Sequence, residues 1–300
     1  MGTVWLTYLK KIKKKMAYIM YGTATYVSPA LNTQLHFLWL NKCLANLKKP
    51  VTFAEKISWL KLHDYAVNPL VKQCADKLQV REYVRQKGLE HMLNPLIAVY
   101  RQPEEIEWDR LPDKFVLKWN YGCGYNLLCP DKNNLNKSWA EKQLRVWGKE
   151  KFWLYNAELQ YNIIEKRIIC ETFLESNELD GLLDYKCYCF HGKVLAILVL
   201  ARSETEETAA VFMNPEWNLI SDVSSKYKRV ILPEQPACLD EMIKAAEILA
   251  EPFPFVRVDF YQQKGQAVFG ELTFTPAAGI NPAETLIDGQ SMGNYLHLKR

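Results

Sequence analysis

Two acidic residues near the C-terminal end of the chain, Asp259 and Glu271, have the types and spacing that bind a divalent cation. Each occupies an interior position of an alternating apolar run, residues 255–261 and 269–276, and the short connection between the runs contains Gly265. This pattern predicts a β-hairpin whose two carboxylates lie on neighbouring strands, where they can share one face. Carboxylates placed so closely repel each other, and their oxygens are ligands that suit Mg²⁺ at a nucleotide site. A surface hairpin whose acids face water is the alternative.

The composition of the 300-residue chain is that of a globular protein, with 49% hydrophobic and 24% charged residues. Its length allows one large domain or two to three modest ones. No run of eighteen or more apolar residues occurs, so we expect no membrane-spanning helix. The eight cysteines form no Cys-x-x-Cys pair and no zinc-binding spacing with the five histidines. We therefore expect free thiols, a reducing compartment and a cytoplasmic location.

Positive charge is concentrated at the N-terminal end. Residues 1–54 contain eight lysines and no acidic residue, whereas the other 246 residues carry 30 basic and 34 acidic side chains. The lysine-rich residues 10–15 are flanked by aromatic and aliphatic residues, a pattern typical of segments that lie on an anionic membrane. We therefore expect residues 1–30 to contact the inner face of the plasma membrane peripherally. A solvated basic helix is the alternative, and the acidic remainder of the chain argues against a nucleic-acid partner.

Two segments upstream of the acidic hairpin have patterns that bear on its surroundings. Residues 69–87 predict one helix that begins with a proline in its first turn. Residues 114–119 predict a strand, and Gly122 and Gly124 follow it directly. Such glycines allow a tight loop whose exposed backbone N–H groups suit a phosphate, although a plain turn explains them equally well.

The order of these parts resembles the ATP-grasp superfamily. Four separated motifs, residues 52–62, 111–118, 184–193 and 255–276, resemble its TupA-like branch more narrowly, so the resemblance covers roughly residues 50–282. That branch is associated with teichuronopeptide and with capsule or exopolysaccharide gene clusters. The resemblance implies an α+β or α/β fold that holds ATP between two β-sheet subdomains.

The same resemblance divides the chain into four parts. Residues 1–49 would form a basic amphipathic extension, and residues 50–110 a small α/β unit. Residues 111–175 would form the lid subdomain, and residues 176–300 the C-terminal subdomain with the metal-binding hairpin.

The resemblance also implies which residues bind the phosphates of ATP. Lys118 would hold the α and β phosphates, and Gly122 and Gly124 would form the flexible loop over them. Lys186 and Arg202, on the two strands of the next hairpin, could also reach the phosphates. A solvent-facing strand lysine is the alternative for Lys118, and a structural ion-pair partner is the alternative for Lys186 and Arg202.

The segment that begins at Glu171 resembles the family's adenine-binding hinge. The backbones of Thr172 and Leu174 would contact the adenine edge. Glu178 would bind the ribose hydroxyls, with Glu175 as the competing choice.

At the acidic hairpin, the resemblance implies that Asp259 and Glu271 are Mg²⁺ ligands. Thr273 would be the third ligand, at a position where the wider superfamily has asparagine. Arg257, two residues before Asp259 on the same strand face, would stabilise charge during transfer of the γ-phosphate.

The implied reaction is the ATP- and Mg²⁺-dependent joining of a carboxylate and an amine through an acyl phosphate. The expected partners are a uronic acid of a surface polysaccharide or its precursor and an amino acid or related amine. A glycan kinase that phosphorylates a sugar hydroxyl is the first alternative. The second is a nucleotide-binding protein without turnover, which the threonine at position 273 weakly suggests.

Overall fold

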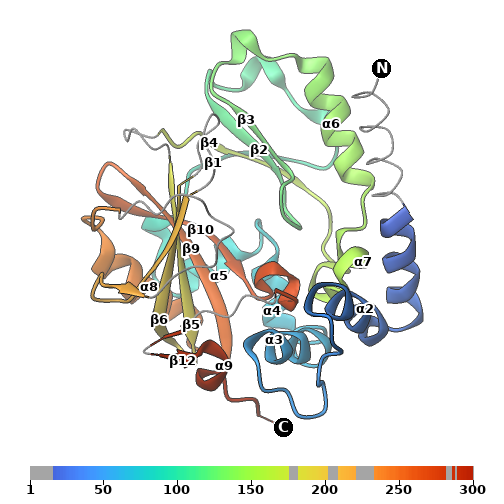
Figure 1. Cartoon of the computed structure of the whole chain (residues 1–300). Helices are drawn as coiled ribbons and strands as arrows, with labels where there is room; N and C mark the ends of the chain where they lie inside the picture. The colour runs from blue at the N-terminus through green and yellow to red at the C-terminus, as the bar shows by residue number, and fades with distance from the viewer. Residues whose placement is uncertain are drawn as a thin grey trace, which may run out of the picture.

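Two antiparallel sheets and a set of short helices make up the protein (Figure 1). The structure, a computed structural model, describes residues 16–175, 182–201, 209–220, 233–281, 286–287 and 289–299. No helix in these segments is long and apolar enough to cross a membrane, as the sequence predicts. The hairpin predicted around Asp259 and Glu271 is present as the last two long strands.

The smaller sheet has four strands in the order β1-β4-β2-β3. Its strands are β1 (Leu96–Tyr100), β2 (Phe115–Trp119), β3 (Asn126–Cys129) and β4 (Ile168–Thr172). Helix α6 (Lys137–Lys149) packs against this sheet. Its side chains Ala140 and Leu144 are buried in one cluster with apolar side chains of the sheet. The predicted boundary at residue 110 falls between β1 and β2, which are strands of one sheet.

The larger sheet has six strands in the order β10-β9-β5-β6-β7-β8 among the described residues. These are β5 (Leu183–Phe190), β6 (Lys193–Ala201), β7 (Ala209–Met213), β8 (Leu219–Ile220), β9 (Phe255–Gln263) and β10 (Gln266–Thr273). Helix α8 (Leu239–Ala250) covers one face of this sheet against β5, β6 and β9, and buries its own apolar side there. The opposite face carries the polar side chains described below.

Short helices surround the two sheets. The α-helices are a first helix over residues 16–27, α2 (Pro29–Asn41), α3 (Phe53–Leu62), α4 (Pro69–Ala75), α5 (Val80–Gln86), α7 (Phe152–Asn156) and α9 (Met292–Tyr295). The 3-10 helices are η1 (Glu90–Met92), η2 (Pro103–Glu105), η3 (Trp108–Arg110), η4 (Lys132–Asn134), η5 (Leu159–Tyr161) and η6 (Pro276–Gly279). A two-stranded ribbon of β11 (Leu286–Ile287) and β12 (Gln290–Ser291) lies near the C-terminal end.

The single helix predicted over residues 69–87 is wrong, because the chain breaks at Asp76 into α4 and α5. The Asp76 carboxylate accepts hydrogen bonds from the backbone N–H of Leu78 at 2.8 Å and from the Asn120 amide at 2.9 Å. Aspartate competes with helical hydrogen bonding in this way. The backbone N–H of Lys77 also donates to the Asn120 carbonyl at 2.8 Å. The break therefore fixes Lys77 beside the loop that follows β2.

Candidate active site

Three charged side chains form a row across the larger sheet. Asp259 on β9 pairs with Lys186 on β5 and with Glu271 on β10, and directly opposed residues share a sheet face. A β-bulge at Gly270 produces this register, since pairing shifts by one residue between Phe269 and Glu271. Without the shift, the Glu271 side chain would point to the opposite, apolar face. The predicted placement of the two carboxylates on one face is therefore confirmed.

Asp259 lies at the centre of this row and is only 2% exposed. Arg257 donates to both of its oxygens, from Nε to Oδ1 and from Nη2 to Oδ2, each at 2.6 Å. Lys186 donates to the same carboxylate at 2.6 Å and forms a second ion pair with Asp184 at 2.5 Å. Burial disfavours the charge of Lys186, but the two carboxylates outweigh it and raise the pKa of that lysine. Lys186 is therefore an ion-pair partner in this structure. Arg257 lies on the same sheet face as Asp259, as predicted.

Glu271 is more accessible than Asp259, with 32% of its side chain exposed. Its Oε2 lies 3.2 Å from Nζ of Lys77, and its Oε1 accepts a hydrogen bond from the Thr273 hydroxyl at 3.2 Å. Arg257 also donates to that hydroxyl oxygen at 3.0 Å. Burial raises the pKa of Glu271, but the charges of Lys77, Arg257 and Lys186 outweigh it and lower that pKa to about 2. Glu271 therefore keeps its negative charge well below neutral pH.

We expect the Glu271→Gln variant to lose part of the acid sensitivity of the fold. The carboxylate has a pKa of about 2 in the folded protein against 4.5 when unfolded, so the unfolded chain binds the proton more readily. Its stabilising contribution is complete above the unfolded pKa and disappears as the pH falls toward 2. The difference in free energy of unfolding between wild type and variant, from denaturant titrations, should therefore shrink from neutral pH to acid pH. A difference that stays constant with pH would contradict these ion pairs.

Lys77 connects the two sheets and is a site residue that the sequence patterns missed. Its Nζ donates to the carbonyl oxygen of Gly122 at 2.7 Å while it pairs with Glu271, and only 14% of its side chain is exposed. One cation thereby holds the loop after β2 against the carboxylate on β10. In the sequence, the adjacent Asp76 and Lys77 were the signal that could have identified this residue. They lie within a segment whose apolar residues recur at helical spacing, so the pattern predicts one helix there.

The predicted glycine loop is a tight turn. Gly122 and Gly124 have φ values of 69° and 80°, in the left-handed region that favours glycine. A side chain at position 122 would meet the ring of Phe152 at 2.8 Å, so this position also lacks room for one. The loop therefore depends on both glycines for its conformation and on Gly122 for space as well.

Glu171 and Lys118, which the family resemblance assigns to the ATP site, are in direct contact on the smaller sheet. Lys118 donates to Oε2 of Glu171 at 2.8 Å, and Arg81 from α5 donates to Oε1 at 3.0 Å. Glu171 is 7% exposed, and 21% of the Lys118 side chain is exposed. Lys118 is therefore a partly buried, ion-paired lysine and not a solvent-facing one.

The backbone of Thr172 is already hydrogen-bonded within the protein. Its N–H donates to the carbonyl of Pro95 at 3.1 Å, and its carbonyl accepts from the side-chain amide of Asn94 at 2.8 Å. The N–H of Thr172 is therefore engaged in this arrangement. Leu174, two residues further on, is half-buried just beyond the end of β4.

Two predicted residues, Glu178 and Arg202, lie outside the described residues. Glu175, the competing choice for the ribose, is exposed and forms an ion pair with Lys114. Both partners of that pair are about half exposed, so this contact lies at the molecular surface.

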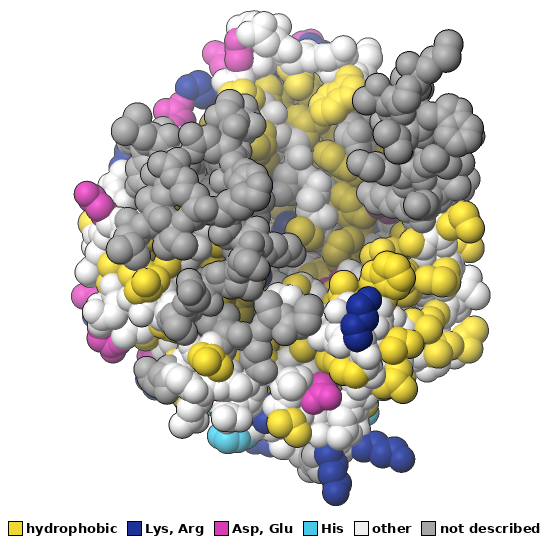
Figure 2. Space-filling model, in the orientation of Figure 1, with side chains coloured by type: hydrophobic (Ala, Val, Ile, Leu, Met, Phe, Trp, Pro, Cys, Tyr) yellow, Lys and Arg dark blue, Asp and Glu magenta, His cyan; other side chains and the backbone are white. Residues whose placement is uncertain are grey.

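The charged groups form two clusters, one on each sheet, and Lys77 joins the loop after β2 to the cluster on the larger sheet. Figure 2 shows the surface hollowed between the part of the molecule built on the smaller sheet and the part below it. Lys118 and Glu171 come from the smaller sheet, Asp259 and Glu271 come from the larger one, and Lys77 pairs with Glu271. Phosphate groups could exchange with the carboxylates as partners of these lysines.

The donor set fits Mg²⁺ in the way nucleotide sites hold it. No group of three or more His, Cys, Asp or Glu side chains in the described segments could hold a metal ion by itself. Mg²⁺ usually takes one or two carboxylates and completes its coordination with water and phosphate oxygens. Asp259 and Glu271, with the Thr273 hydroxyl beside them, provide that number of hard oxygen donors.

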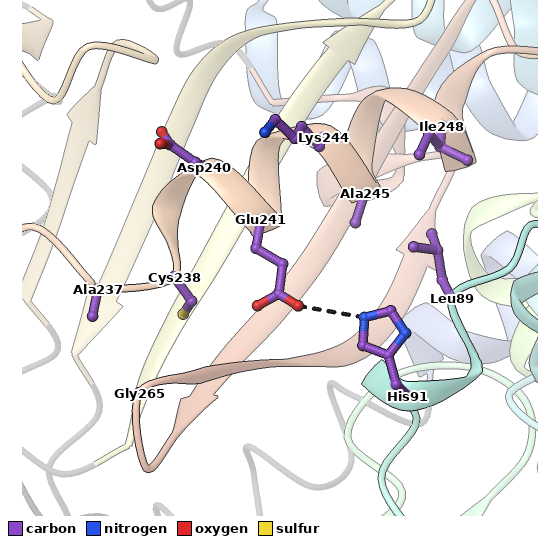
Figure 3. A pocket seen from close by; sticks show the side chains of 10 residues that line it. All are labelled: Leu89, His91, Ala237, Cys238, Asp240, Glu241, Lys244, Ala245, Ile248 and Gly265. Atoms are coloured by element: carbon purple, nitrogen blue, oxygen red, sulfur yellow. Dashed lines mark ion pairs between the residues drawn. The ribbon is translucent and has the colours of Figure 1, made fainter.

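A separate pocket of about 520 Å³ lies against α8, η1 and the β9–β10 turn (Figure 3). His91 pairs with Glu241 at 3.4 Å across it, and its other lining residues include Asp240 and Lys244. It shares no lining residue with the charged row, so it is not part of the candidate active site.

Several solved structures are similar to this chain. D-alanine–D-alanine ligase from Bacillus anthracis, complexed with ATP, is 20% identical with a TM-score of 0.45, and the match covers 73% of this chain and 60% of that one. The ATP-grasp ligase PsnB, complexed with a minimal precursor, is 12% identical with a TM-score of 0.40, and the match covers 73% and 60%. Phosphoribosylamine–glycine ligase from Thermotoga maritima is 12% identical with a TM-score of 0.42, and the match covers 74% and 55%.

The match thus spans 60% of the first two of these chains and 55% of the third. No curated protein matches. The model of the TupA-like ATP-grasp family matches residues 55–295, which is most of the chain and includes every site residue described above. This match confirms the resemblance that the four sequence motifs indicate. The chain therefore belongs to the TupA-like family of the ATP-grasp ligase superfamily and has a mixed α/β fold of that type.

Proposed function

We propose that this protein is an ATP- and Mg²⁺-dependent ligase that joins a carboxylate to an amine and releases ADP and phosphate. One observation carries the proposal: Lys77, Lys186 and Arg257 converge on two carboxylates, Asp259 and Glu271, that share one sheet face. Lys77 and Lys118 would bind an anionic ligand, and Asp259 and Glu271 would hold a cation beside it. This combination suits a magnesium nucleotide.

Each part of the site has a role in this reaction. Lys118, Lys77 and the loop of Gly122 and Gly124 would bind the phosphates of ATP, and the chain near Leu174 would contact adenine. Glu178 would bind the ribose, and Lys186 and Arg202 would add positive charge near the phosphates. Each of these roles is part of the proposal.

The charged row would hold the metal and stabilise the transferred group. Asp259, Glu271 and Thr273 would bind Mg²⁺, which when bound neutralises the charge of the transferring phosphoryl group. Arg257 already donates two hydrogen bonds to Asp259, so its guanidinium is oriented before any ligand binds. A preorganised cation of this kind favours a transition state in which negative charge develops.

The reaction then needs no protein nucleophile. A carboxylate oxygen of the acceptor attacks the γ-phosphorus of ATP, the bond to the β,γ-bridging oxygen breaks, and ADP leaves. The amine nitrogen attacks the acyl carbon, phosphate leaves with that carboxylate oxygen, and the amine loses a proton to water. Holding the reactants in place accounts for most of the acceleration in such a mechanism.

We further propose the substrates and the compartment. The acceptor would be a uronic acid of a surface polysaccharide or its precursor, and the donor an amino acid or related amine, as the association of the family suggests. None of the eight cysteines forms a disulfide bond, and six of them are buried, which supports a reducing, cytoplasmic compartment.

Isotope transfer from the carboxylate tests the acyl phosphate. Purified protein is incubated with Mg-ATP, amino acids and a panel of uronic acid glycans whose carboxylates carry ¹⁸O, and the products are analysed by mass spectrometry. We expect acceptor-dependent ADP, an amide product, and inorganic phosphate that contains one ¹⁸O. Hydroxylamine in place of the amine should give a hydroxamate.

Two results would contradict the proposal. A phosphorylated sugar that keeps its ¹⁸O would identify a glycan kinase. Failure to bind Mg-ATP in a calorimetric titration would contradict both enzymatic functions and favour a protein without turnover.

A further inference from the structure

The first helix of the structure has its apolar side turned toward solvent. Its exposed positions recur at helical spacing and are apolar apart from Thr23: Met16, Ile19, Met20, Tyr26 and Val27. Ile19 is 57% exposed and Val27 is 72% exposed. Helices on a globular protein normally bury such a stripe against the core. This helix therefore presents an apolar face that nothing in the described part of the chain covers.

Buried polar contacts hold the helix in this orientation. The Thr25 hydroxyl donates to the Leu154 carbonyl at 2.6 Å. The side-chain amide of Asn32, on α2, donates to the Tyr21 carbonyl at 2.9 Å and to the Thr25 hydroxyl at 2.8 Å. Turning the apolar stripe inward would leave these buried polar groups without partners, which is costly. The exposure is therefore built into the fold.

Helix α2 and the residues after it extend the same exposed apolar surface. Figure 2 shows hydrophobic side chains gathered over the part of the molecule where the first helix and α2 lie in Figure 1. The exposed side chains from this second segment are Leu31, Leu38, Trp39, Leu40 and Leu44. Together with those of the first helix, they form what we call the N-terminal apolar surface. Contiguous exposed apolar patches of this kind mark interaction sites.

The sequence segment that supplies this surface carries charge of one sign. Residues 1–54 carry eight lysines and no acidic residue, although the chain as a whole has a net charge of only +4. Lys42 donates to the Trp39 carbonyl at 2.8 Å, and its ammonium group lies 5.2 Å from the centre of the Trp39 ring. A tryptophan beside a lysine is typical of segments at a membrane interface, where the ring enters the headgroup region and the ammonium stays near phosphates.

We propose that the N-terminal apolar surface docks on a bilayer that contains anionic lipids. An anionic headgroup layer complements the lysines, and the acyl region beneath it covers the apolar side chains. A second copy of the chain fits less well, because it would bring two lysine-rich segments of the same sign together. The inference is independent of the proposed function.

Vesicle sedimentation with the full-length protein tests this surface. We expect the protein to bind vesicles of phosphatidylcholine with phosphatidylglycerol, and to bind pure phosphatidylcholine vesicles at least about tenfold more weakly. Ile19→Asp should lower the partition coefficient on the anionic vesicles at least about tenfold, because it places a negative charge on the docking face. Trp39→Ala should lower it about fivefold or more through loss of buried apolar area.

A matched control distinguishes docking through this surface from nonspecific adsorption through any exposed tryptophan. Trp139 on α6 is 55% exposed, close to the 69% of Trp39, and it lies outside the N-terminal apolar surface. Trp139→Ala should therefore bind the anionic vesicles as the wild type does. Equal binding by wild type, Ile19→Asp and Trp39→Ala would overturn the proposal. So would a lipid-free dimer that Ile19→Asp converts to monomer without any vesicle binding, since the surface would then join two copies.

Discussion

Asp259→Asn is expected to lower ATP-dependent turnover by roughly a thousandfold, the largest effect of any single substitution in the charged row. Asparagine keeps the shape of the side chain but removes the negative charge that would hold Mg²⁺. It also replaces one of the two oxygens that accept hydrogen bonds from Arg257 with an amide nitrogen, which cannot accept them. Both losses act on the step in which charge develops on the transferring phosphoryl group, so kcat should fall more than the affinity for ATP.

The same substitution is also expected to destabilise the protein by about 3–5 kcal/mol, because two buried cations lose one of their carboxylate partners. Asp259 is 2% exposed, and both Arg257 and Lys186 pair with it. Thermal denaturation and Mg-ATP titration of the variant separate the loss of chemistry from the loss of fold. Asp240→Asn, an exposed acid on α8, is the matched control and should retain full turnover. A folded Asp259→Asn protein with turnover within a few fold of wild type would contradict the assigned role.

Lys77→Met is expected to lower kcat/KM for ATP by about a hundredfold, mainly through a higher KM. The Lys77 ammonium group contacts the Gly122 carbonyl and the Glu271 carboxylate, so it lies where the glycine loop and the metal-binding hairpin meet. Methionine has similar length and fills the same space without charge. The triphosphate would then lose one of its cations, and the loop would lose its tie to the larger sheet.

Two further observations would support the role of Lys77 specifically. Lys77 is the first of the charges that lower the pKa of Glu271, so the stability contribution of Glu271 should be lost at a higher pH in the variant. Lys72→Met, one turn earlier on α4, changes the same residue type and should leave KM for ATP within about twofold of wild type. If both methionine variants have the KM of wild type, Lys77 does not bind the nucleotide.

The sequence predicted the hairpin and its carboxylates because their signals are local. Alternating apolar residues around Asp259 and Glu271, with Gly265 between the runs, specify two paired strands without reference to the rest of the chain. The family motifs added Arg257 and Lys118, and the structure brings these into contact with the predicted acids Asp259 and Glu171, respectively.

The features that the sequence did not predict depend on distant contacts. Asn120 is 44 residues from Asp76, so the hydrogen bond between them that supports the break between α4 and α5 leaves no local pattern. The engaged N–H of Thr172 likewise depends on Pro95, which reaches it only when β1 and β4 pair. The sequence indicated membrane contact by residues 1–30, but not which side of the first helix faces outward, because periodicity identifies an apolar stripe and not what covers it.

The place of β1 in the smaller sheet determines where the lid could be cut from the rest of the protein. A fragment that begins at residue 111 would lack β1, so β4 would become an edge strand. The buried residues Ile168, Ile169 and Cys170 would then lose the strand that pairs with them. Unpaired edges with apolar side chains are templates for aggregation. The smallest self-contained lid therefore starts upstream of Leu96. The smaller sheet is thus built from chain on both sides of the predicted boundary at residue 110.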